Sequence, residues 1–215
     1  MKLLFIGNSY TYYNDLPKTL AALAEENGHA VTTEAVTKGG WKLFQYLDVR
    51  NEYAEKLDAL LASEHFDAVF LQEQSLLPAT DPEAFLDGVT RLSERLRGKT
   101  DRTVLYVTWG RKEGSKDLEA HGWTRAEMTD RLAASYERAA EAVGAETSHV
   151  GRAFLALNLL YPEIDLHHAD LTHPSALGTA LAAAVHYRTL FGEPPASLAS
   201  LGLDEATEQA FREVL

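Results

Sequence analysis

Residues 3–9 of the chain read LLFIGNS, and they give the clearest indication of the fold. Its first four residues form an uninterrupted apolar run, as expected for a strand that is covered on both faces of a sheet. Gly7 ends the run, and a helical pattern follows at about residues 15–28. A buried strand followed by a helix is the unit from which parallel α/β sheets are built.

The same unit recurs to the end of the chain. Further strands are predicted at residues 30–36, 68–71, 104–107 and around 145–150. Further helices are predicted at about residues 50–63, 82–97, 124–143 and 174–190. The alternation predicts an α/β fold of about five parallel strands with helices on both faces, in a single domain over residues 1–215.

The composition limits the classes of function. The 215 residues include no cysteine, which excludes disulfides, thiolate zinc sites and cysteine nucleophiles. The 20 basic and 32 acidic side chains give a net charge of −12, so no nucleic-acid or membrane partner is expected. No run approaches the roughly 18 apolar residues of a membrane helix. The apolar run at residues 3–6 is too short for a secretory signal, so a cytoplasmic location is expected.

Ser9 is a candidate nucleophile because of its place in this pattern. Ligands of such sheets bind beyond the carboxyl ends of the strands, and Ser9 follows the first strand by three residues. Backbone N–H groups at this edge could face a developing oxyanion. The simpler interpretation is that Ser9 or Asn14 caps the next helix, as small polar residues often do.

The segment at residues 170–174, DLTHP, favours the chemical interpretation. A serine becomes a good nucleophile when an imidazole takes its proton, and the imidazole needs a carboxylate to fix its tautomer. Asp170 lies three residues before His173, so a single turn would bring its carboxylate to the imidazole Nδ1. Pro174 rigidifies the start of the following helix.

A metal-dependent hydrolase is the alternative for the same segment. Imidazole and carboxylate groups suit zinc, iron or manganese, and the residues that carry them are His167, His168, Asp170 and His173. Adjacent histidines tend to point apart, and no HExxH or comparable motif occurs elsewhere in the sequence. The serine mechanism is therefore preferred, and no metal is expected.

Two weaker features follow the second and third strands. The adjacent Gly39 and Gly40 allow the backbone to approach a ligand closely, or simply allow a tight turn. Residues 72–75 read QEQS, and amides at the end of a strand can donate hydrogen bonds to an oxyanion. Both features are expected at the same edge of the sheet as Ser9, and this shared placement strengthens them.

Four blocks together resemble the SGNH (GDSL-type) hydrolase superfamily. They are GNSYT at residues 7–11, GG at 39–40, LQEQS at 71–75 and DLTHP at 170–174. The resemblance extends from Leu4 to about Tyr187, and it points to a bacterial branch with an IGNS(F/Y)T opening and an LQEQS-like third block. It implies a three-layer, flavodoxin-like α/β/α sandwich and an esterase that needs no cofactor.

The resemblance also implies roles for the residues of the first and last blocks. Ser9 would be the nucleophile, His173 the general base and Asp170 its orienting acid. The first block carries Asn8 where many members carry aspartate. Activity should then fall in acid, because a protonated His173 cannot accept the Ser9 proton.

The oxyanion hole implied by the resemblance has three donors. They are the backbone N–H of Ser9, a backbone N–H of the Gly39 and Gly40 pair (Gly40 preferred), and a side chain of the third block. This block lacks the Gly-x-Asn that is usual in the family. Gln72 is the expected substitute donor, with Gln74 as the alternative.

Aromatic side chains are frequent in the loops expected at this edge, namely Tyr10, Tyr12, Tyr13, Trp41, Trp109 and Trp123. Their faces would suit stacking on sugars, and they would equally suit closing the rim of the core. Because no loop carries a long apolar stretch, we expect short acyl groups such as O-acetyl, on a small-molecule or carbohydrate ester. A non-catalytic carbohydrate-binding domain would keep these aromatics and leave Ser9 unused.

Overall fold

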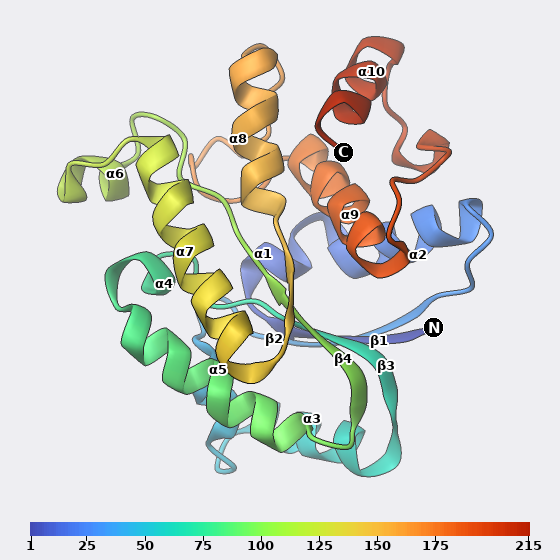
Figure 1. Ribbon diagram of the computed structural model, residues 1–215, viewed down its shortest axis with the longest axis vertical. Helices are drawn as coiled ribbons and strands as arrows, with labels where there is room; N and C mark the ends of the chain where they lie inside the picture. Colours follow the sequence, from blue (N-terminus) through green and yellow to red (C-terminus); the bar gives the residue numbers. More distant parts are fainter.

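The computed structural model describes residues 1–215 and contains one sheet of five parallel strands (Figure 1). The strands lie in the order β2-β1-β3-β4-β5. Their bounds are β1 (Lys2–Gly7), β2 (Thr32–Thr37), β3 (Phe66–Leu71), β4 (Thr100–Tyr106) and β5 (Glu146–Ser148). In this flavodoxin-like order, the direction of winding reverses between β1 and β3. The predicted fold class is confirmed.

Helices cover both faces of the sheet (Figure 1). One face carries α2 (Leu16–Glu26), α8 (Val150–Leu160), α9 (Ala176–Phe191) and α10 (Glu205–Val214). The other carries α3 (Glu52–Ser63), α5 (Pro82–Leu96) and α7 (Arg125–Val143). None of the helices is long and apolar enough to cross a membrane.

Short helices occupy the loops at the carboxyl ends of the strands. They are α1 (Ser9–Tyr12), α4 (Leu77–Thr80) and α6 (Lys116–His121), together with the 3₁₀ helices η1 (Tyr13–Asp15) and η2 (Leu43–Leu47). A third 3₁₀ helix, η3 (Ala199–Leu201), packs instead at the C-terminal end of α2, where its backbone N–H groups donate to Glu26. The sequence pattern does not predict α4 and α6, because four and six residues are too few to reveal a helical period.

The side chains of β1 explain why the sheet needs helices on both faces. Leu3 and Phe5 pack in the layer with α2 and α9, whereas Leu4 and Ile6 pack in the layer with α3 and α5. Successive strand residues point to opposite faces, so a continuous apolar strand must be covered twice. The parallel register places Phe5 opposite Phe70 of β3, and their rings stack with centroids 4.7 Å apart. β1 is thereby fixed at the centre of the fold.

His186 is a buried titratable group in this core. Its Nδ1 lies 2.7 Å from the hydroxyl of Ser148, and its Nε2 has no hydrogen-bond partner. The ring meets Tyr106 and Phe70 edge to face. Burial lowers the pKa of His186 to about 3, so the ring is neutral in the folded chain at neutral pH.

We expect His186 to lower the stability of the fold in acid. Between about pH 6.5 and about pH 3 the unfolded chain binds a proton at this residue that the folded chain does not. Above pH 6.5 His186 is neutral in both states, and its contribution to the free energy of unfolding is at its maximum. Through the window below pH 6.5, the free energy of unfolding falls by about 1.4 kcal/mol for each pH unit of acidification. Glu73, whose pKa burial raises to about 7, acts in the opposite direction.

Urea unfolding at several pH values between about 4.5 and 6.5 measures this effect. In wild type the free energy of unfolding should fall more steeply with decreasing pH than in His186→Gln, and the difference in slope should be about 1 kcal/mol per pH unit. His121→Gln, at an exposed position, is the matched control and should keep the wild-type slope. Because the Glu73 contribution is common to all three proteins, equal slopes would contradict the burial argument.

Candidate active site

Ser9 lies directly beyond the carboxyl end of β1, in the first turn of α1. The cap of this helix is Asn8, whose Oδ1 accepts a hydrogen bond from the backbone N–H of Tyr10 at 3.2 Å. The Asn8 amide also donates to the carbonyl of Trp41 at 3.0 Å. Ser9 therefore does not cap α1, and α2 begins after Asp15 with no side-chain cap, so neither Ser9 nor Asn14 has the capping role of the simpler interpretation. The Ser9 hydroxyl faces another partner.

That partner is His173, which the fold brings from near the other end of the chain. Its Nε2 lies 2.8 Å from Ser9 Oγ, and its Nδ1 lies 2.7 Å from Asp170 Oδ2. The second carboxylate oxygen of Asp170 accepts the backbone N–H groups of Thr172 and His173, both at 2.9 Å. The Asp-x-x-His spacing thus forms one tight turn, and the structure brings the three residues into a continuous hydrogen-bonded chain.

The charge on Asp170 fixes the tautomer of the imidazole. Burial alone would raise the pKa of Asp170, but the backbone N–H groups of His173 and Thr172, together with the His173 ring, hold it well below its usual value. An ionised carboxylate can only accept, so Nδ1 carries the ring proton and Nε2 is left to accept from Ser9. The ring of Tyr13 stacks on the imidazole at 4.3 Å and holds its plane.

The other histidines of this segment do not join a metal site. The ring of His167 is buried and its Nε2 lies 3.1 Å from the carbonyl of Gly110, and burial lowers its pKa to about 4. His168 is exposed, with Nδ1 at 3.5 Å from Asp170. No group of three or more His, Asp or Glu side chains is arranged to hold a metal ion. The arrangement does not match the metal-dependent alternative.

The glycine pair forms a turn beside Ser9. The backbone N–H of Trp41 donates to the carbonyl of Lys38 at 3.1 Å, and Gly40 occupies the third position of this turn with φ +72°. A positive φ at that position favours glycine. At Gly39 a Cβ would lie 2.8 Å from the hydroxyl of the exposed Tyr12 side chain, so a larger residue there would displace that ring.

The backbone N–H groups of Ser9 and Gly40 have no acceptor within the protein. Both residues line a cavity of about 220 Å³ that also contains His173. Gly39 does not line this cavity, which favours Gly40 as the donor of the pair. Two residues with free backbone donors thus border the cavity that contains the Ser9 and His173 side chains.

Gln72 lies elsewhere, contrary to the prediction that it donates to an oxyanion. Its Oε1 accepts from the backbone N–H of Asn8 at 2.8 Å and from the hydroxyl of Thr11 at 3.0 Å, and its Nε2 donates to the carbonyl of Glu73. A Cβ on Gly7 would lie 2.7 Å from this Oε1, so the glycine makes room for the amide. Gln72 supports the turn that carries Ser9, and it does not line the cavity.

Gln74 is the amide that lines the cavity. Its Oε1 accepts the backbone N–H groups of Leu76 and Leu77 at 3.0 and 2.9 Å, and its Nε2 has no partner in the protein. Gln72 still pairs with β1 through its backbone N–H, whereas Gln74 lies two residues farther out, beyond the sheet. This difference in position explains why the two amides have different surroundings.

Glu73 is a residue whose importance the sequence did not reveal. Its carboxylate is fully buried and accepts the backbone N–H of Leu43 at 3.1 Å and that of Gln74 at 2.6 Å. Burial raises the pKa of Glu73 to about 7, although both backbone donors lower it. The side chain joins the loop that contains Gly40 to the block that contains Gln74, and so fixes the spacing of the cavity walls.

Arg111 is a second such residue. It lies in the loop after β4, is 5% exposed and lines the same cavity as Ser9. Its Nε donates to Asp117 at 2.7 Å and its Nη2 to the hydroxyl of Ser75 at 2.9 Å, while its Nη1 contacts the hydroxyl of Tyr10. No sequence signal marked it, because most arginines lie on the surface.

The aromatic residues divide between the two predicted roles. Tyr10 and Trp109 are buried and stack on each other at 4.6 Å, so they close the rim of the core. Trp123 lies beside Arg131 of α7, away from the cavity. Tyr12 is exposed near the glycine turn and is free to contact a ligand.

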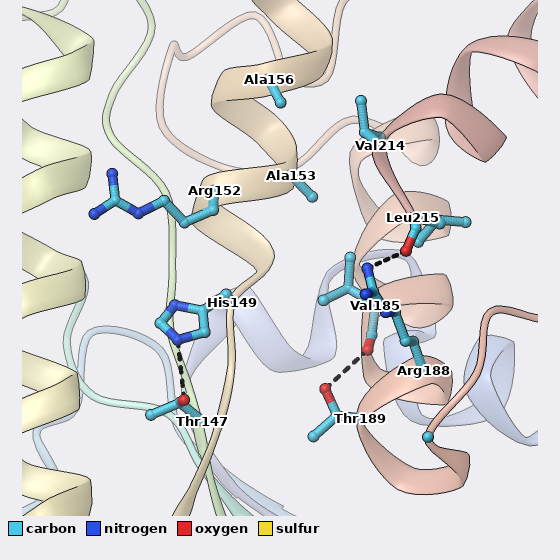
Figure 2. Close-up of a pocket in the computed structure, with 11 residues that line it drawn as sticks. Thr147, His149, Arg152, Ala153, Ala156, Val185, Arg188, Thr189, Val214 and Leu215 are labelled. Atoms are coloured by element: carbon cyan, nitrogen blue, oxygen red, sulfur yellow. Dashed lines mark hydrogen bonds between the residues drawn. The ribbon is translucent and has the colours of Figure 1, made fainter.

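A cavity of about 500 Å³ lies between α8 and α9, beside the edge strand β5 (Figure 2). It contains a hydroxyl–imidazole pair, since Thr147 Oγ1 lies 3.0 Å from His149 Nε2. The Nδ1 of His149 is buried without a partner, and the Glu137 carboxylate lies 3.8 Å from Nε2, the same nitrogen that faces Thr147, so no carboxylate orients this ring through Nδ1. Figure 2 also shows Arg188 bonded to Leu215 on the opposite wall. This cavity lacks the features of a serine hydrolase site.

The sequence matches no family model and no curated protein, but solved structures resemble it over most of its length. A candidate SGNH hydrolase from Slackia heliotrinireducens is 31% identical, with a TM-score of 0.75 over 88% of this chain and 98% of that one. A DUF4886 family protein from Bacteroides uniformis is 19% identical, with a TM-score of 0.81 over 100% and 92%. An acetyl xylan esterase is 16% identical, with a TM-score of 0.68 over 89% and 100%.

The last two similarities concern the fold alone. The Slackia heliotrinireducens protein is also similar in sequence, with 31% identity over 88% of this chain and 98% of that one. This similarity agrees with the four sequence blocks, which indicate the same family. The chain therefore belongs to the SGNH hydrolase superfamily.

Proposed function

We propose that this chain is a serine esterase that removes short acyl groups, foremost O-acetyl, from small-molecule or carbohydrate esters. The observation that carries the proposal is the hydrogen-bonded chain in which His173 lies 2.8 Å from Ser9 Oγ and 2.7 Å from Asp170. A hydroxyl, a neutral imidazole and an ionised carboxylate in that order provide an activated nucleophile.

The proposed mechanism has two halves. His173 takes the Ser9 proton as Oγ attacks the ester carbonyl, and Asp170 stabilises the imidazolium that forms. The negative charge on the former carbonyl oxygen is met by the backbone N–H groups of Ser9 and Gly40 and by the Nε2 of Gln74. His173 then passes its proton to the leaving alcohol, and water releases the acyl group by the same steps.

The surroundings of Ser9 support a short acyl group. Only one of the nine residues that line the cavity, Tyr10, is hydrophobic, and the volume is about 220 Å³. A long acyl chain would need an extended apolar groove. The exposed ring of Tyr12 and the similarity in fold to an acetyl xylan esterase lend support to a sugar as the alcohol part.

Ser9→Ala should lower kcat/KM on p-nitrophenyl acetate by at least about a thousandfold, because no other hydroxyl faces the Nε2 of an imidazole whose Nδ1 is bonded to a carboxylate. The melting temperature should stay close to that of wild type, since Asn8 caps α1. Ser63→Ala, on the exposed surface of α3, is the matched control and should keep wild-type activity. Activity retained by Ser9→Ala, or activity removed by a chelator, would disprove the serine mechanism.

Asp170→Asn should lower kcat on the same ester by at least about a hundredfold, because it removes the charge that stabilises the imidazolium and can favour the wrong tautomer. Asp165→Asn is the matched control. Asp165 contacts Lys112 at 2.5 Å and the backbone of His167 at 3.1 Å, and it does not touch His173. We expect its kcat to stay within about tenfold of wild type. A larger loss of kcat in Asp165→Asn than in Asp170→Asn would identify Asp165 as the residue that orients His173.

Gln74→Glu should lower kcat by about a hundredfold or more with little change in KM, as expected for a donor that serves mainly the transition state. The substitution keeps the Oε1 that accepts from Leu76 and Leu77, and it removes the Nε2 donor. Gln45→Glu, whose Oε1 accepts the N–H of Lys42 outside the cavity, controls for the added charge. If Gln74→Glu keeps the wild-type kcat, Gln74 is not a donor, and the oxyanion hole consists of backbone N–H groups alone.

A further inference from the structure

Arg111 places a fixed positive charge in the wall of the Ser9 cavity. Its side chain is 5% exposed, and it lines the cavity together with Ser9 and Ser75. Although the chain carries a net charge of −12, no acidic side chain lines this cavity. The acidic residues Asp117 and Asp170 pair with Arg111 and His173 from outside the lining, so Arg111 presents its cationic group to the cavity without a carboxylate among the lining residues.

The hydrogen bonds of Arg111 leave part of its guanidinium unused. A guanidinium carries five N–H groups. Three of them have partners in the protein, which are Asp117 for Nε, the Tyr10 hydroxyl for Nη1 and the Ser75 hydroxyl for Nη2. One N–H on each of Nη1 and Nη2 has no protein acceptor. Asp117 contacts the Nε edge, so both Nη atoms are without a carboxylate partner.

A role in joining loops does not account for this choice of residue. Burying a cation is costly unless its donors are satisfied, and neutral side chains could link Tyr10 to Ser75 without that cost. The planar guanidinium is the side chain that best binds carboxylates, through two N–H groups at once. A substrate carboxylate would supply the acceptors that the two Nη atoms lack.

We propose that Arg111 determines specificity by binding a carboxylate that the ester substrate carries. The inference rests on the proposed function, because it takes the cavity in front of Ser9 as the site where the ester binds. The carboxylate would belong either to the acyl part, as in a half-ester of a dicarboxylic acid, or to the alcohol part, as in an acetylated hydroxy acid. Both place an anion a few bonds from the ester carbonyl.

Binding to the Ser9→Ala variant, measured by calorimetry, tests the proposal without turnover. Monoethyl succinate is compared with diethyl succinate for the acyl side, and acetoxyacetate with its ethyl ester for the alcohol side. In at least one pair the carboxylate should bind about tenfold more tightly than the neutral ester, as expected for hydrogen bonds to a charged group. The pair that shows the preference identifies the side. Equal affinities in both pairs would overturn the proposal.

Two further substitutions in the Ser9→Ala background separate recognition from loop support. Arg111→Gln should abolish the preference for the carboxylate. Asp117→Asn should increase the preference by about threefold or more, because it removes the negative charge beside Nε and keeps an acceptor for it. If Arg111 only supports the loops, both variants will weaken charged and neutral ligands alike. Should Arg111→Gln fail to fold, Arg111→Lys and Asp117→Asn decide the matter, since Arg111→Lys keeps the charge and should keep part of the preference.

Failure of the proposal and failure of the proposed function give different results. If Ser9 is not the nucleophile, Ser9→Ala will keep esterase activity whatever its ligand preference. If Ser9 is the nucleophile and Arg111 does not bind a substrate carboxylate, Ser9→Ala will be inactive and will bind charged and neutral ligands equally. The binding measurements alone therefore test whether Arg111 binds a substrate carboxylate.

Discussion

The pairing of β1 with β3 at the centre of the sheet is the constraint on which the rest of the site depends. Both strands are covered on both faces, so their register is fixed by packing, as the stack of Phe5 on Phe70 illustrates. The ladder extends by one hydrogen bond beyond β3, from the N–H of Gln72 to Ile6. That bond sets the Gln72 amide beneath Asn8, and the amide in turn holds the turn that presents Ser9.

Buried polar side chains connect the loops that this edge brings together. Glu73 joins the loop of the glycine turn to the third block, and Arg111 joins the loop after β4 to Tyr10 and Ser75. Such groups are costly to bury unless they are hydrogen-bonded, and when they are satisfied they hold loops in one arrangement. The cavity in front of Ser9 is thus built from side chains whose own positions are fixed, which is what a site needs to keep reacting groups within a fraction of an ångström.

The sequence predicted the features that depend on local pattern. The apolar run of β1 led to the parallel fold, and the Asp170 and His173 spacing led to the turn in which they meet. It failed where the outcome depends on three-dimensional surroundings. Gln72 and Gln74 are chemically identical and two residues apart, and only the extra ladder bond turns the first one away from the cavity. Arg111 could not be found because its neighbours Tyr10 and Ser75 lie 101 and 36 residues away in the chain.

Everything proposed for this site requires that Ser9 is the nucleophile and that His173 activates it. The most direct test is to treat the wild-type chain with a fluorophosphonate at pH 8 and to map the modified residue by peptide mass spectrometry. We expect a single adduct on the peptide that contains Ser9. An adduct on any other residue, or complete absence of labelling in a folded protein that hydrolyses short esters, would contradict this role of Ser9.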